Sequence, residues 1–272
     1  MTSPLRLRAI MLDWAGTTID HGSIAPVAAL QELFAQHRID LSAVDARHDM
    51  GLLKRDHIRA ILALPIVSEQ WHAARGLAPA AEDVDSLFTE FRSLQAAVLP
   101  RYSRVIDGVA EATSAWQARG LRIGSSTGYT REMLAPIAAQ AAADGYYPDA
   151  SVCPDEVGAG RPAPWMLARN AQLLDVYPPS ACVKIGDTVS DIEEGRNAGM
   201  WTIGITRTGN LIGLDAADWA QLPTYEKQLR LQDAAETLLN AGAHFVAEDL
   251  PACNDILLQI EERLQNRMHP GI

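Results

Sequence analysis

Five short apolar runs, each ending in small or acidic residues, are the feature that most constrains the fold of this chain. They occupy residues 8–13, 121–126, 150–153, 182–186 and 201–205. A helix-like stretch precedes each of the later four, at residues 109–119, 131–143, 164–174 and 191–198. This alternation predicts an α/β fold with a doubly wound, Rossmann-like parallel sheet, whose active site lies beyond the carboxyl ends of the strands.

The segment between the first two runs has a different pattern. Residues 24–100 lack strand alternation, and apolar residues recur there at helical spacing, as at Val27, Leu30 and Leu33. We interpret residues 23–100 as a helical cap domain inserted into an α/β core domain that comprises residues 1–22 and 101–272. The two crossings, near residues 20–23 and 100–107, would be hinges of a lid that excludes water. The tail, residues 229–268, reads as helix, short strand and helix at the sheet edge.

Composition narrows the partners and the compartment. The 272 residues carry 23 Lys and Arg against 34 Asp and Glu, a net charge of -11, and no basic run, which argues against nucleic acid. The three cysteines are far apart and form no C-x-x-C, so neither a disulfide framework nor a zinc site is indicated. No leader-like apolar stretch opens the chain and no segment approaches the about 20 apolar residues of a membrane span, which favours a cytoplasmic protein without a membrane partner.

Asp13 closes the first apolar run and opens residues 13–18, DWAGTT. This is where an enzyme that forms an acyl phosphate keeps its nucleophilic carboxylate. Phosphatases of that design carry a second aspartate two residues later, where this chain has Ala15. A leaving group must therefore be activated by another residue, and Lys54 is the candidate.

Two further acids, Asp187 and Asp191, follow the fourth apolar run. At a strand end and a helix start, both can face Asp13 across neighbouring strands. Hard oxygen ligands without His or Cys favour Mg²⁺, which would offset the repulsion between a carboxylate and an anionic phosphorus group. The alternative is that Asp191 or Ser190 only caps the helix and Asp187 only sits in a turn.

Two other loops can supply contacts to an anion. Ser126 and Thr127 end the second run ahead of a helix, where a hydroxyl and free backbone N–H groups converge; helix capping by Thr127 or Thr130 explains the same letters. Arg161 lies in a loop rich in Gly and Pro, and its guanidinium matches phosphoryl oxygens. Its alternative is a surface arginine paired with Asp155 or Glu156.

Within the predicted cap, helical spacing puts Met50, Lys54 and His57 on one face. Desolvation among apolar neighbours would lower the pKa of Lys54 and leave a neutral amine able to attack a carbonyl. His57, one turn away, is suited to moving protons near neutral pH. The alternative is an ordinary solvated lysine and a packed histidine.

Taken in order, Asp13, the strand end at Ser126 and Thr127, Arg161 and the acidic loop at residues 186–191 resemble the four motifs of the haloacid dehalogenase superfamily. Coverage is nearly the whole chain. Within that superfamily, DWAGTT at residues 13–18, GLLKRDH at 51–57 and STGYTREM at 126–133 look like the phosphonatase family. The two departures from the wider superfamily, Ala15 for an acid and Arg161 for a lysine, are expected of that family.

The resemblance implies hydrolysis of the P–C bond of phosphonoacetaldehyde to acetaldehyde and phosphate. Lys54 would condense with the aldehyde to form a Schiff base that accepts electrons. Asp13 would then attack phosphorus, giving an aspartyl phosphate that water hydrolyses. Other superfamily chemistry on a small phosphorylated metabolite, such as a phosphohydrolase or mutase reaction, is disfavoured by Ala15. A ligand-binding relative without activity is disfavoured by the presence of Asp13 and Asp187.

The resemblance also implies roles for the remaining site residues. The Ala15 carbonyl would bind Mg²⁺ beside Asp13 and Asp187, with Asp191 acting directly or through water. Substrate contacts are expected from Met50, Gly51, Ser126, Thr127, Gly128 and Arg161. His57 and Tyr129 are expected to assist proton transfer. A homodimer is expected too, and the apolar residues 27–34 are a candidate pairing surface.

Overall fold

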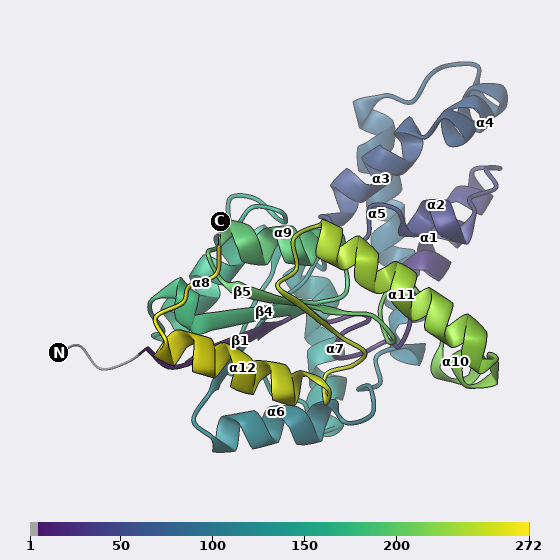
Figure 1. The fold of residues 1–272 in the computed structure, drawn as a ribbon. Helices are drawn as coiled ribbons and strands as arrows, with labels where there is room; N and C mark the ends of the chain where they lie inside the picture. Colours follow the sequence, from purple (N-terminus) through teal and green to yellow (C-terminus); the bar gives the residue numbers. More distant parts are fainter. Residues whose placement is uncertain (1–4, 272) are drawn as a thin grey trace.

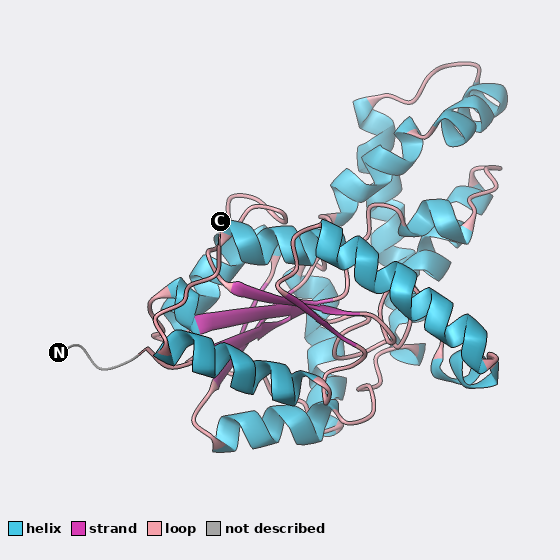
Figure 2. Cartoon of the chain, in the orientation of Figure 1, coloured by secondary structure: helices cyan, strands magenta, loops and turns pink. Residues whose placement is uncertain are grey.

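The computed structural model describes residues 5–271 and contains a six-stranded, all-parallel sheet in the order β3-β2-β1-β4-β5-β6 (Figure 2). The strands are β1 (Ala9–Leu12), β2 (Arg122–Ser126), β3 (Ala150–Val152), β4 (Cys182–Gly186), β5 (Trp201–Ile205) and β6 (Phe245–Ala247). The predicted doubly wound α/β fold is therefore confirmed. The first strand lies at the centre, between β2 and β4, so that residues following these three strands meet at one edge.

Helices cover both faces of the sheet (Figure 1). Side chains of β1 alternate between two apolar clusters: Ile10 and Leu12 pack with residues of α6, α7 and α12, while Ala9 and Met11 pack with residues of α8. The helices of the core are α6 (Val109–Ala118), α7 (Arg131–Ala143), α8 (Trp165–Leu173), α9 (Val189–Asn197), α10 (Ala216–Gln221), α11 (Thr224–Asn240) and α12 (Cys253–Gln265), with short 3₁₀ turns at Leu99–Arg101, Pro154–Glu156 and Pro179–Ala181.

Five of the helices between β1 and β2, those that precede α6, project from one end of the sheet (Figure 1). They are α1 (Ile24–Gln36), α2 (Ala43–Arg47), α3 (Lys54–Ala63), α4 (Pro65–Arg75) and α5 (Ala81–Val98). Buried residues recur along α5 at helical spacing, at Val84, Leu87 and Phe91, and this face packs against α1. We refer to α1–α5 as the cap helices; the predicted domain boundaries remain a prediction.

The apolar residues of α1 are buried within the single chain. Val27, Leu30, Leu33 and Phe34 all belong to the main apolar cluster of the molecule. The pattern that made residues 27–34 a candidate pairing surface is therefore explained by packing among the cap helices. The homodimer itself remains a prediction.

No helix in residues 5–271 is long and apolar enough to cross a membrane. The cytoplasmic location remains a prediction, and residues 1–4, on which it partly depends, lie outside the described part of the chain.

Candidate active site

Asp13 lies just beyond β1, at the edge where three parallel strands end. Its backbone N–H donates to the carbonyl of Ile185 on β4, 3.0 Å away. In the turn that follows, the Trp14 carbonyl accepts from the N–H groups of residues 17–19. The Thr18 hydroxyl donates to the Asp13 carbonyl at 3.0 Å. These bonds fix the backbone on both sides of the Asp13 side chain, which is only 5% exposed.

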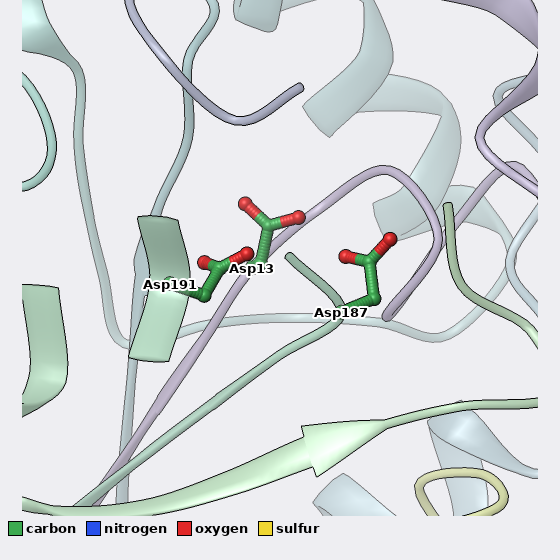
Figure 3. A group of neighbouring side chains, drawn as sticks. All are labelled: Asp13, Asp187 and Asp191. Atoms are coloured by element: carbon green, nitrogen blue, oxygen red, sulfur yellow. The ribbon is translucent and has the colours of Figure 1, made fainter. Parts of the chain in front are cut away.

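The three predicted acids converge. One carboxylate oxygen from each of Asp13, Asp187 and Asp191 lies within 4.8 Å of the others, and all three side chains are buried (Figure 3). Asp187 accepts from the Thr17 hydroxyl at 3.1 Å and from the backbone N–H of Asn210 at 2.7 Å. The site is an all-oxygen cluster, the type of donor set that suits Mg²⁺.

Asp191 combines the helix-capping role considered above with a place in the acidic cluster. Its Oδ2 accepts from the Thr188 hydroxyl at 2.6 Å and from the Thr188 N–H at 3.2 Å, which caps α9. Its Oδ1 lies 3.0 Å from Arg161 Nη2 and 2.8 Å from Lys184 Nζ. Asp191 therefore links the cluster to two buried cations.

The charges of the cluster shift its pKa values in opposite directions. Burial and the charge of Asp191 raise the pKa of Asp13 against the pull of Arg161, and burial and Asp13 raise the pKa of Asp187 well above its ordinary value. Burial would also raise the pKa of Asp191, but Arg161 and Lys184 outweigh it, so that this pKa is lowered. Carboxylates that are buried and close to one another in this way favour binding of a cation.

Arg161 is buried at the centre of an ion-pair network. Its Nη2 lies 2.7 Å from Asp13 Oδ1 and 2.9 Å from the Ser126 carbonyl, and its Nε lies 2.9 Å from Glu194 Oε2. The alternative of a surface arginine is wrong, because Arg161 is 5% exposed, and Glu156 pairs with Arg131 instead.

The loop after β2 lies beside this network. The Thr127 hydroxyl accepts from the Tyr129 N–H at 3.2 Å, and the Thr130 side chain makes no capping bond at the start of α7, where Asp155 accepts from the Arg131 N–H at 3.0 Å instead. The capping alternative for this motif is therefore not seen. The Ser126 hydroxyl faces the network, where it donates to Glu194 at 3.0 Å and accepts from Arg161 and Lys184.

Lys54 approaches the site from the cap helices and is 3% exposed. Its Nζ donates to the sulfur of Met50 at 3.2 Å. Burial, only partly opposed by the charge of Asp13, lowers the pKa of Lys54 to about 8. The alternative of a solvated lysine is wrong for this structure.

The helical face predicted for Met50, Lys54 and His57 is only partly present. Helix α3 begins at Lys54, and Met50 lies in the preceding turn, where Gly51 has a φ of 93° that interrupts the helix. His57 is fully buried on α3, and burial and the charge of Lys54 lower its pKa well below the ordinary value.

Residues 48–53, which we call the cap loop, lie directly on the core. A side chain at Gly51 would collide with the hydroxyls of Thr188 and Ser190, and the Ser190 hydroxyl donates to the Met50 carbonyl at 3.3 Å. A Cβ at Gly128 would come within 2.8 Å of the Leu52 carbonyl. Both glycines therefore permit the close approach of the cap loop to the core.

One pocket joins the core and cap residues, with a volume of about 20 Å³, room for about one water molecule. Asp13, Lys54 and Arg161 line it. The other lining residues are Ala15, Ser23, Pro26, Met50, Gly51, Thr127, Gly128, Tyr129 and Thr188. Four predicted site residues, Ser126, His57, Asp187 and Asp191, lie behind this lining. A ligand larger than a water molecule would need this lining to move, as the predicted hinges would allow; the hinges themselves remain a prediction.

Two buried residues of the network were not predicted. Lys184 is fully buried in β4, and Glu194 is fully buried on α9, where it accepts from Ser126 and Arg161. Signals for both exist in the sequence: Lys184 interrupts an apolar run, and Glu194 lies three residues after Asp191, on the same face of a helix.

Comparison with known families places the chain among hydrolases. The model of the haloacid dehalogenase-like hydrolases matches residues 7–199. The chain is 40% identical over 259 residues to a phosphonoacetaldehyde hydrolase of Bacillus thuringiensis (strain Al Hakam), covering 95% of this chain and 98% of that protein. A phosphonoacetaldehyde hydrolase of Bacillus cereus (strain G9842) is 39% identical over the same shares.

Solved structures give the same picture. A phosphonoacetaldehyde hydrolase-like protein from Oleispira antarctica superposes with a TM-score of 0.97 at 37% identity, covering 99% of this chain and 98% of that one. A putative β-phosphoglucomutase from Bacteroides vulgatus has a TM-score of 0.67 at 17% identity, covering 96% and 91%, and shows a shared fold alone.

Proposed function

Because the chain belongs to the haloacid dehalogenase-like hydrolases and, over nearly its whole length, to the family of its phosphonoacetaldehyde hydrolase relatives, we propose that it hydrolyses phosphonoacetaldehyde to acetaldehyde and phosphate. The observation that carries this proposal is the buried Lys54 amine, with a pKa of about 8, in one pocket with the Asp13 carboxylate. A phosphate ester needs no amine there, whereas cleavage of a P–C bond needs an acceptor for the electrons left on carbon.

In the first step the neutral Lys54 amine adds to the aldehyde carbon. The adduct takes up a proton and loses water, which gives a protonated imine with a C=N bond in place of the C=O bond. A pKa near 8 keeps an appreciable fraction of the amine unprotonated at neutral pH. Burial keeps His57 neutral and Tyr129 protonated, and we assign both to proton transfer: Tyr129 from the pocket lining, and His57 from behind it, three residues after Lys54 on α3.

In the second step an Asp13 oxygen attacks phosphorus. The O–P bond forms as the P–C bond breaks, and the electron pair of that bond moves into the iminium, giving an enamine on Lys54. Arg161, Thr127 and Gly128 line the pocket on the core side, where a guanidinium, a hydroxyl and a backbone N–H can hold the phosphonyl oxygens. Ala15 fits this step, because carbon leaves without a proton donor at that position.

Water then hydrolyses the aspartyl phosphate at phosphorus and restores Asp13. The enamine takes a proton on carbon and returns to an imine, which a second water hydrolyses to acetaldehyde and free Lys54. Met50 and Gly51 shape the pocket around this carbon, since Met50 contacts the amine and Gly51 lets the cap loop close on the core.

The acidic cluster fits Mg²⁺, because its donors are carboxylate oxygens, and burial together with their mutual repulsion raises the pKa values of Asp13 and Asp187. Asp13, Asp187 and the Ala15 carbonyl would hold the ion. Asp191 would act directly or through water, since both of its oxygens already have protein partners. Such an ion supplies positive charge that offsets the repulsion between a carboxylate and an anionic phosphonyl group. We also propose a homodimer and a cytoplasmic location, on the likeness to the family.

Trapping with borohydride tests the proposal at Lys54. Borohydride added with phosphonoacetaldehyde should reduce the imine and leave a mass adduct on the peptide that contains Lys54. A Lys54→Arg variant should show no adduct and no phosphate release, while Lys227→Arg, a lysine outside the pocket, should behave as the wild type. Full turnover without any adduct would refute the imine, and faster phosphate release from p-nitrophenyl phosphate than from phosphonoacetaldehyde would refute the substrate.

A further inference from the structure

Residues 206–214, between β5 and α10, touch three functional parts of the molecule; we call them the β5 loop. Toward the crossing from β1 into the cap helices, the Gly22 N–H donates to the Thr208 carbonyl at 2.7 Å, and the Thr208 hydroxyl donates to the Gly16 carbonyl at 2.7 Å. His21 Nδ1 lies 2.9 Å from the Leu214 carbonyl. The β5 loop is thus bound to the hinge as well as to the core.

Arg47 connects the β5 loop to the cap helices. It is the last residue of α2, and its Nη1 lies 3.1 Å from Asn210 Oδ1 and 2.8 Å from the Gly22 carbonyl. Its Nη2 donates to the Gly213 carbonyl at 3.1 Å. Asn210 Nδ2 donates back to the Arg47 carbonyl at 3.2 Å, so that the two residues are paired through side chains and backbone.

The β5 loop is shaped to receive the guanidinium. Gly213 has a φ of 66°, and a Cβ there would come within 2.6 Å of Arg47 Nε. The hydrogen bonds of the partly buried Arg47 side chain all go to neutral carbonyl and amide groups, while Asp20 and Asp187 act on it through their charges. Several directed bonds to backbone carbonyls define a position, which is the geometry of a docking contact.

Asn210 carries the contact to the acidic cluster. Its backbone N–H is the 2.7 Å donor to Asp187 Oδ2, one of the two hydrogen bonds that orient this carboxylate. Arg47, at the other end, immediately precedes the cap loop, which leads to Lys54 seven residues later. The pair therefore lies between the two halves of the proposed site.

We propose that Arg47 and Asn210 form a latch that docks the cap helices on the core, which brings Lys54 into the pocket at the same time as it fixes Asp187. Both are positioning residues, since neither lines the pocket. The catalytic consequence rests on the proposed function, whereas the docking itself does not. Release of the latch would widen the pocket for substrate entry, and its engagement would then bring the Lys54 amine onto the bound molecule.

The catalytic arm of the test uses Arg47→Ala and Asn210→Ala. Each should lower the rate of borohydride trapping at Lys54 about tenfold, and the double variant should be little worse than either, because the two residues act through one contact. The pH at half-maximal trapping should also rise, since an undocked amine returns toward its ordinary pKa. Arg59→Gln, an exposed cap arginine paired with Asp56, should match the wild type. Additive losses with an unchanged pH midpoint would overturn the latch.

A second arm works without any assumption about the reaction. Hydrogen exchange in the cap loop and in the β5 loop should speed up together in Arg47→Ala and in Asn210→Ala, while exchange in β1 and β4 stays slow. Arg47→Lys, which keeps the charge without the planar fork, should give an intermediate rate and serves where Arg47→Ala does not fold. Unchanged exchange in both loops of folded variants would overturn the proposal. If the wild type fails to form a Lys54 adduct, the proposed function falls while this arm still decides the latch.

Discussion

Two cations reach the same pocket from opposite sides, and their surroundings have little in common. Arg161, from the core, lies among the carboxylates of Asp13, Asp191 and Glu194, and these outweigh burial and raise its pKa. Lys54, from the cap helices, is equally buried but donates its hydrogen bond to the sulfur of Met50, and burial lowers its pKa. The contrast shows that burial alone does not decide the charge of a group. Arg161 keeps its charge because carboxylates surround it. Lys54 can lose its charge because its hydrogen-bond partner is a neutral thioether.

The largest expected effect lies on the core side of this comparison. Asp13→Asn should lower phosphate release by at least about 10⁴-fold, because the proposed nucleophile is lost. Trapping at Lys54 should persist, since the proposed mechanism places imine formation before the attack on phosphorus. Rates of phosphate release and adduct formation, measured on one folded preparation, check both statements. Loss of the adduct in that variant would show that imine formation at Lys54 depends on Asp13, and that the core and cap sides of the pocket do not act independently.

A smaller effect is expected when one of the carboxylates around Arg161 is removed. Glu194→Gln keeps the size of the side chain but removes a charge that Arg161 and Lys184 share, and it should lower the free energy of unfolding by about 2–3 kcal/mol. Activity should fall more through kcat than through KM, because Arg161 Nε loses the negative charge that helps to hold it in place. Denaturant unfolding and steady-state kinetics provide the measurements. Glu193→Gln, on the exposed face of α9, is the matched control, and equal losses in the two variants would contradict the network.

The smallest effect, and one of opposite sign, is expected at Lys54. Between pH 8 and the ordinary lysine pKa of 10.5, the unfolded chain binds a proton that the folded chain has lost, so this group makes stability rise with pH in that window. Below pH 8 Lys54 is protonated in the folded chain as well, and its buried charge lowers the free energy of unfolding by the full amount. Lys54→Met should therefore raise the free energy of unfolding at pH 7 by on the order of 2 kcal/mol, and the gain should shrink above pH 8.

Thermal unfolding of Lys54→Met and wild type from pH 6 to 10 measures this gain. Lys227→Met, a lysine outside the site, should show no such dependence on pH. A Lys54→Met protein less stable than the wild type at pH 7 would mean that the pocket accommodates the charged amine, and the contrast with Arg161 would then fail.

Much of the fold could be predicted because it depends on local patterns. The bounds of β4, β5 and α7 agree with the predicted runs 182–186, 201–205 and 131–143, since apolar strands and an amphipathic helix end at recognisable turns. The convergence of Asp13 with Asp187 followed from topology alone, because neighbouring parallel strands end at the same edge. The start of α3 was harder to predict from the sequence, since it depends on the left-handed backbone conformation at Gly51.

The contacts that tune the site were beyond sequence reasoning. Arg161 and Asp13 are 148 positions apart, and Arg47 and Asn210 are 163 apart, so no periodicity connects them. The Ser126 hydroxyl looked free to meet an anion, yet three buried partners occupy it. A local sequence motif indicates which side chains could bind a ligand or react. The tertiary structure determines which of these side chains are not already occupied by other protein groups.

The small volume of the closed pocket has a consequence for the order of events in the proposed reaction. With the cap helices docked there is room for about one water molecule, which is less than a phosphonyl group needs. The substrate would therefore bind to a wider form of the pocket, and the cap helices would dock on the bound molecule rather than on an empty site. Under the proposed function, the separation of Lys54 and Asp13 would then differ between the free protein and its substrate complex.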